Sequence, residues 1–118
     1  MSNTFGSYVR GRREDLHKTN AGYSVRKLAE KVGIQPSYIS KVERDEVPPP
    51  SEDTIIRIAE ALQEDPDVLL ALAGKVSADL RTAITKRPKL FAELIRQLKD
   101  APDHALLRVV REVRDGQW

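Results

Sequence analysis

The side chains of this sequence that could do chemistry are cations, amides and hydroxyls rather than nucleophiles or metal ligands. Cysteine is absent, which excludes disulfides, thiolate zinc sites and cysteine nucleophiles. The two histidines, His17 and His104, lie far apart and have no neighbours at metal-ligand spacing. No HExxH, glycine-rich phosphate loop or serine-nucleophile motif occurs. We therefore expect a binding protein rather than an enzyme, with no metal and no cofactor.

The charged residues are distributed unevenly along the chain, although the net charge is only +2. Residues 1–44 carry nine Lys/Arg and four Asp/Glu, so this segment is basic. Residues 45–74 are acidic, with one Arg and eight Asp/Glu. Residues 75–118 carry ten Lys/Arg and six Asp/Glu. A basic N-terminal segment is a reason to consider a polyanionic partner such as nucleic acid. An ordinary solvated surface is the alternative interpretation.

The length and composition favour a small helical protein. A chain of 118 residues suits one compact domain, or a small domain with an appendage. No stretch approaches the roughly 20 apolar residues that span a bilayer, and residues 1–11 lack the apolar segment of a secretory signal. Because alternation of apolar and polar residues is nearly absent, we expect an all-α fold. These observations predict a soluble, cytoplasmic protein with no membrane partner.

The segment VRKLAEKVGIQPSYISKVER (residues 25–44) predicts two short helices that meet across a tight turn. Ser24 is a good N-cap for the first helix, expected over residues 25–32. Gly33 accepts the left-handed conformation that ends a helix. Proline suits the first position of a helix, so the second helix is expected over residues 36–44.

Three further helices are expected around this pair. One covers about residues 4–18 and is followed by a loop at 19–22, one is capped by Ser51, and one begins at Asp65 and ends near Gly74. The apolar residues of the last two helices are Ile55, Ile56, Ile58, Ala59, Leu62, Val68, Leu69, Leu70 and Leu72.

The whole pattern resembles the helix-turn-helix of the lambda-repressor-like family, also called the Cro/CI or Xre type, over about residues 5–74 as five helices. Outside the two central helices, the matching features are Phe5-Gly6, Arg13, Ser24, the triplet Val42-Glu43-Arg44 and Pro50-Ser51. The resemblance implies a DNA-binding domain at residues 1–74, whose second central helix lies in the major groove.

The resemblance also implies a role for individual side chains. Amides pair with adenine, arginine or lysine with guanine, and serine with either base, while the free N–H groups at a helix start attract phosphate. Two roles remain open for Tyr38, namely contact with DNA and packing within the protein. Two roles also remain open for Arg44, namely contact with a base and contact with a phosphate. The expected base-contacting residues are Gln35, Ser37, Tyr38, Ser40, Lys41 and Arg44. The expected phosphate-contacting residues are Ser24, Arg26, Lys27 and Arg10, and Arg13 would form a structural ion pair with Glu43.

The sequence departs from the family pattern in two places. The loop around residues 17–20 is longer than usual, and Asp45 stands where the family usually has glycine. Aspartate tolerates the left-handed backbone region better than most residues, so we expect the turn to survive. Asp45 and Glu46 also bring negative charge towards the DNA backbone, from which we expect weaker non-specific affinity.

Residues 75–118 predict two or three amphipathic helices, punctuated by Pro88 and Pro102. A short amphipathic helix needs a surface to cover, and a two-fold dimer would place two recognition helices on one face of DNA. We therefore favour a homodimer through this extension. The alternative is a protein partner, such as a toxin or a metallopeptidase. The expected dimer or partner surface comprises Leu106, Leu107, Val110 and Val113.

Taken together, these features predict a sequence-specific, double-stranded DNA-binding transcriptional regulator. A repressor that acts on its own or a neighbouring promoter is the simplest form. The alternative is an antitoxin or a protease-controlled repressor whose C-terminal extension binds a protein partner.

Overall fold

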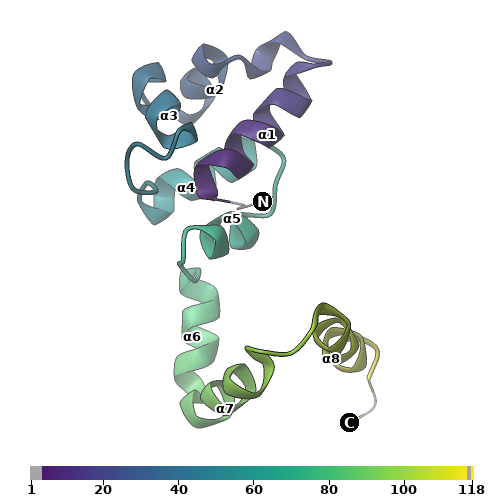
Figure 1. Cartoon of the computed structure of the whole chain (residues 1–118). Helices are drawn as coiled ribbons and strands as arrows, with labels where there is room; N and C mark the ends of the chain where they lie inside the picture. The colour runs from purple at the N-terminus through teal and green to yellow at the C-terminus, as the bar shows by residue number, and fades with distance from the viewer. Residues whose placement is uncertain (1–3, 117) are drawn as a thin grey trace. The chain divides into compact units, whose positions relative to one another are not determined.

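The computed structural model describes residues 4–116 and 118, and every regular element among them is a helix, which confirms the expected all-α fold. The chain divides into two compact units, Met1–Ser77 and Ala78–Trp118 (Figure 1). The helices of the first unit are α1 (Phe5–His17), η1 (Ala21–Tyr23), α2 (Val25–Val32), α3 (Pro36–Glu43), α4 (Glu52–Ala61) and α5 (Pro66–Leu72). Those of the second unit are α6 (Ala78–Lys86), α7 (Pro88–Leu98) and α8 (Asp103–Asp115).

Helix α1 begins with a reciprocal cap. The Thr4 hydroxyl accepts a hydrogen bond from the Ser7 amide, and the Thr4 amide donates to the Ser7 hydroxyl, both at 3.0 Å. Two N–H groups that a helix start would otherwise leave unpaired are thus satisfied.

The connection after α1 is more ordered than the expected loop at residues 19–22. It contains the 3-10 helix η1, which starts where the Asn20 side-chain oxygen accepts a hydrogen bond from the Gly22 amide at 2.8 Å. Tyr23, at the end of η1, is buried in the core. The composition of residues 19–22 indicates only a loop, because the core contact of Tyr23 depends on residues distant in the sequence.

The central pair forms as its capping residues indicate, and α2 and α3 lie side by side in Figure 1. Helix α2 has the expected bounds, Val25–Val32, with the Ser24 hydroxyl accepting from the Lys27 amide at 3.2 Å. Gly33 ends α2 with φ at +81°, in the left-handed region. Helix α3 starts at Pro36 and ends one residue earlier than expected, so that Arg44 is its C-cap.

Residues from all five α-helices of the first unit form its hydrophobic core. The largest fully buried side chains are Val9, Leu28, Val32, Ile39, Ile55, Ile58, Leu62, Leu69 and Leu70. Ser51 is the N-cap of α4, as expected, but its hydroxyl donates to the Thr54 hydroxyl and makes no capping hydrogen bond. Ile56, expected in the buried face of α4, is only partly buried, and Val68 of α5 is 41% exposed. A short helix such as α5 buries only one face, and Val68 lies outside it.

Arginine side chains satisfy the carbonyls at two helix ends. Arg57 on α4 donates to the Val32 carbonyl at 3.0 Å, at the end of α2. Arg12 on α1 donates to the Leu62 carbonyl at 3.1 Å, at the end of α4. Because these carbonyls have no partner within their own helix, such contacts fix how α1, α2 and α4 pack.

In the second unit, Pro88 is the first residue of α7 and Pro102 is the N-cap of α8. No described residue of α6, α7 or α8 is buried. Leu90 is 70% exposed and Val110 is 56% exposed. The apolar faces expected for this segment therefore remain largely uncovered within the second unit.

Within residues 4–116 and 118, we find no helix with the length and apolar character that a membrane span needs.

Two glycines of α1 should respond to substitution in opposite ways. A Cβ at Gly6 would collide with the Val42 carbonyl oxygen of α3, whereas a Cβ at Gly11 would meet nothing within 4 Å. We expect Gly6→Ala to lower the free energy of unfolding by about 1–3 kcal/mol. Gly11→Ala should raise it by about 0.5–1 kcal/mol, because alanine favours a helix interior. Urea unfolding of both variants measures this, and equal effects would contradict the close approach of α1 and α3.

Candidate nucleic-acid interface

A buried ion pair holds α3 against α1. Arg13 Nε donates to Glu43 Oε2 at 2.7 Å, and Arg13 Nη2 donates to Glu43 Oε1 at 2.9 Å. The third Arg13 nitrogen donates to the Tyr23 carbonyl at 3.2 Å. The two side chains are only 10% and 5% exposed. The hydrogen bond with Glu43 raises the pKa of Arg13 despite the opposing effect of burial.

This ion pair constrains the orientation of α3 relative to α1. A bidentate arginine–carboxylate pair allows only one relative geometry of the two groups. Glu43, the last residue of α3, faces Arg13 on α1, so the opposite side of α3, its outer face, is turned away from α1. Arg13 and Glu43 are thus positioning residues for the side chains on that outer face.

Tyr23 is a site residue that the sequence analysis missed. Besides its carbonyl contact with Arg13, its ring lies under the Lys31 ammonium, 3.7 Å from the ring centroid. Its hydroxyl accepts a hydrogen bond from Gln63 at 3.3 Å. The available signal was its position just before the N-cap Ser24, where an apolar residue packs against the first turns of a helix.

The outer face of α3 carries most of the expected base-contacting residues. Gln35, Ser37 and Lys41 are exposed, and in the described part of the chain none of them has a side-chain hydrogen bond or ion pair. Tyr38 and Ser40 are half-buried, so they reach solvent over only part of their surface. The structure therefore leaves an unengaged amide at the N-cap of α3, and unengaged hydroxyl and ammonium groups on its exposed side.

The expected phosphate-contacting residues lie on α1 and at the start of α2. The Ser24 hydroxyl caps α2 and Arg26 is exposed. Lys27 lies 3.8 Å from Glu30, a loose pair that leaves the ammonium largely hydrated. Arg10 is bound by Glu14 at 3.1 Å on the same helix.

Asp45 and Glu46 both have partners within the protein. Asp45 has φ at +56°, the left-handed conformation that glycine usually supplies. Its carboxylate accepts hydrogen bonds from the Thr4 hydroxyl at 2.7 Å and the Gly6 amide at 3.2 Å. Asp45 therefore ties the end of α3 to the start of α1, where the helix dipole favours a negative charge.

Glu46 binds the neighbouring Arg44 side chain through two hydrogen bonds of 3.1 Å. These bonds lower the pKa of Glu46 and raise that of Arg44. Arg44 is thus the one expected base-contacting residue whose charged group already has a carboxylate partner in the described structure.

A hollow of about 180 Å³ lies beside the buried ion pair of Arg13 and Glu43. Its walls come from α1, α2 and α3, and its lining residues are Arg10, Arg13, Val25, Ser40, Glu43 and Arg44. Four of these residues are charged, so the hollow suits an ionic group rather than an apolar ligand.

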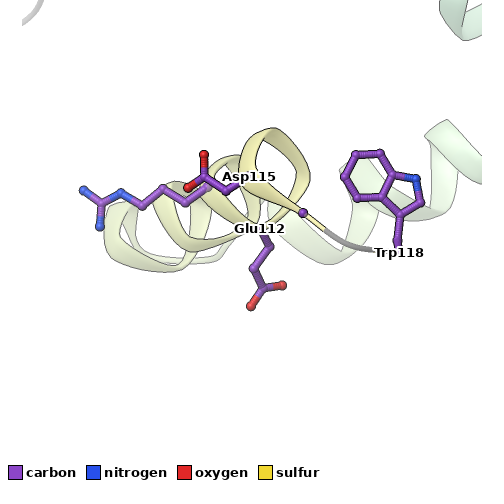
Figure 2. A pocket seen from close by; sticks show the side chains of 5 residues that line it. Glu112, Asp115 and Trp118 are labelled. Atoms are coloured by element: carbon purple, nitrogen blue, oxygen red, sulfur yellow. The ribbon is translucent and has the colours of Figure 1, made fainter.

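The second unit has a larger hollow, of about 520 Å³, at the end of α8. Figure 2 shows its walls: the Glu112 and Asp115 carboxylates point away from each other, and the Trp118 indole lies beyond the helix end. Because the polar groups do not converge, this hollow is not a convincing ligand site. Among the described residues, no cluster of histidine and acidic side chains is arranged to hold a metal ion.

Comparison with known proteins gives three findings. Residues 18–69 match a family model described as helix-turn-helix. Two proteins of Mycobacterium tuberculosis, strains CDC 1551 / Oshkosh and ATCC 25618 / H37Rv, are both named uncharacterized HTH-type transcriptional regulators. Each is 37% identical in a 94-residue alignment that covers 71% of this chain and 63% of the relative. The chain thus spans less than two thirds of these relatives.

The third finding is a solved structure of a SinR protein/SinI protein complex. It is similar with a TM-score of 0.51 and 22% sequence identity, over 97% of this chain and 100% of that chain. At this level of identity, the likeness concerns the fold.

Loss of one partner of the buried pair should be severely destabilising. Glu43→Ala leaves the Arg13 charge buried without its carboxylate, and we expect a loss of about 3–5 kcal/mol in the free energy of unfolding. Replacement of both residues, as Arg13→Met with Glu43→Leu, should recover most of this loss, because no unpaired charge remains. Urea unfolding measures both variants. A cost below about 1 kcal/mol for Glu43→Ala would show that the pair does not position α3.

Proposed function

Because residues 18–69 match a helix-turn-helix family model and two relatives of 37% identity are named HTH-type transcriptional regulators, we propose that this protein is a sequence-specific, double-stranded DNA-binding transcriptional regulator. The observation that carries the proposal is the exposed N-terminus and outer side of α3, where Gln35, Ser37 and Lys41 are exposed and unengaged within the described structure. The buried pair of Arg13 and Glu43 holds this face in one orientation.

The side chains of this face have the chemistry that base recognition needs. In this type of domain, the second helix of the pair lies in the major groove and its N-terminal residues contact base edges. Gln35 and Ser37 lie at the N-terminal end of α3, and Lys41 lies about one turn further along. A glutamine amide recognises adenine through two hydrogen bonds, and a lysine recognises guanine.

The start of α2 is suited to bind the DNA backbone. Its N–H groups and helix dipole attract a phosphate, and Arg26 and Lys27 add positive charge there. Such contacts set the position of the protein on DNA without reading its sequence. They provide the fixed register in which α3 reads the bases.

We assign the protein a repressor role at its own or a neighbouring promoter. A protein that occupies a promoter blocks polymerase without any further contact, so repression needs the fewest additional features.

We also propose that the second unit forms a homodimer through α7 and α8. Helix α7 carries Leu90, Leu94 and Ile95 on one exposed face, and α8 carries Leu107, Val110 and Val113 on another. A short helix gains little stability in water unless its apolar face is covered. A second copy would cover these faces and place two recognition helices on the same side of the duplex.

If α3 reads bases, substitutions on it should reduce the preference of the protein for its own promoter over scrambled DNA. The protein should bind a DNA fragment from its own upstream region at least about a thousandfold more tightly than a scrambled fragment, at physiological salt. Gln35→Ala and Lys41→Ala should each reduce this discrimination by about 1–3 kcal/mol. Fluorescence anisotropy over a salt series measures the affinities.

Matched controls come from the second unit. Lys86→Ala and Lys99→Ala remove the same ammonium group from exposed positions at the end of α6 and just after α7, and should leave the discrimination unchanged. If the wild-type protein bound both fragments equally weakly, with only a dependence on salt, base reading by α3 would be wrong.

The dimer proposal predicts a change of mass. Val110→Glu places a charge on the exposed apolar face of α8 and should convert a dimer to a monomer in sedimentation equilibrium. His104→Glu adds the same charge outside the apolar set of α8 and should leave the dimer intact. A wild-type monomer that co-purifies with a small partner would instead support the antitoxin alternative.

A further inference from the structure

The hollow between α1 and α3 has arginines on its rim and a neutralised pair in its lining. Arg13 and Glu43 line it, and their charges compensate each other through two short hydrogen bonds. Arg10 from α1 and Arg44 from the end of α3 line the same hollow, and both side chains are more than half exposed. Two solvent-accessible guanidinium groups thus border one small polar space.

Both of these arginines are bound by carboxylates of the protein itself. Glu14 lies 3.1 Å from the Arg10 guanidinium. Glu46 binds Arg44 through two parallel hydrogen bonds, each 3.1 Å long. A carboxylate presents two oxygens to a guanidinium in much the same geometry as a phosphate. The two glutamates therefore occupy the donors that a phosphate would use.

The position of Arg44 favours a phosphate over a base as its partner on DNA. Base edges are contacted mainly from the N-terminal residues of the recognition helix. Arg44 is the C-cap of α3, and at about 1.5 Å per residue it lies roughly 12 Å along the axis from Pro36. At this end of the helix, the hollow shared with Arg10 opens beside it.

We propose that Glu46 and Glu14 compete with a DNA backbone phosphate for Arg44 and Arg10, so that DNA binding at this hollow is an exchange of ion-pair partners. This inference rests on the proposed DNA-binding function and adds a device that limits affinity. Each phosphate contact of the hollow forms only when an internal ion pair breaks. Because phosphate carries no sequence information, the competition reduces affinity for every duplex alike.

The test uses the full chain and the substitution Glu46→Gln. We expect the dissociation constants for promoter and scrambled duplexes to fall by the same factor, about two- to fivefold, which is the range for an exposed ion pair. In an Arg44→Ala background, Glu46→Gln should change the dissociation constants much less, because the guanidinium for which Glu46 and the phosphate compete is then absent. Equal effects in both backgrounds would reduce the role of Glu46 to general charge repulsion and overturn the proposal.

Arg44→Ala separates phosphate contact from base reading. It should weaken binding to both duplexes uniformly and reduce the slope of the salt dependence by about 1. A loss confined to the promoter duplex would make Arg44 a base reader and contradict the proposal. Glu14→Gln should repeat the Glu46→Gln result, with its effect lost in an Arg10→Ala background.

Glu60→Gln is the matched control. It removes one negative charge from an exposed residue of α4 that has no side-chain partner in the described structure, and it should leave both affinities within about twofold of wild type. Unfolding in urea verifies that all variants fold.

The two proposals fail in distinguishable ways. The ratio of promoter to scrambled affinity in the wild-type protein tests base reading. The Arg44 and Glu46 double-mutant cycle on the scrambled duplex tests the competition without any base reading. Absence of binding to any duplex at low salt would overturn both.

Discussion

The buried pair of Arg13 and Glu43 is the constraint on which the first unit depends. Three arginine nitrogens reach the Glu43 carboxylate and the Tyr23 carbonyl, so one guanidinium joins α1, η1 and α3. A charge removed from water is stable only if it is fully paired. Any other packing of these elements would leave a buried charge without a partner. The exposed residues of α3 owe their common orientation to this polar contact as well as to the apolar core beneath it.

The end of α3 uses its acidic residues for internal contacts. Asp45 binds the start of α1 through the Thr4 hydroxyl and the Gly6 amide, and Glu46 binds Arg44. The negative charge expected to face DNA is therefore compensated in the free protein. On this basis, the two acids have different roles: Asp45 stabilises the turn in which it lies, while Glu46 sets how readily Arg44 is released to a phosphate.

The second unit differs physically from the first. Helices α6 to α8 have no buried residue in the described part of the chain, whereas the first unit has a core of many fully buried side chains. Apolar side chains left in water are a source of binding free energy. A two-fold dimer through α7 and α8 would supply the missing core, and it would also double the number of DNA contacts available to one particle.

The sequence by itself determined the local elements and the side-chain chemistry of α3. Ser24, Gly33 and Pro36 act through hydrogen bonds and backbone angles within a few residues, so the bounds of α2 and the start of α3 could be read from them. The tertiary structure alone decided the contacts that neither a local pattern nor the family resemblance indicated. The burial of Tyr23, the exposure of Val68 and the contact of Asp45 with α1 depend on residues distant in the chain. The hollow that joins Arg10 to Arg44 likewise exists only after α1 and α3 have packed, because local sequence patterns hold no information on partners more than about a helical turn away.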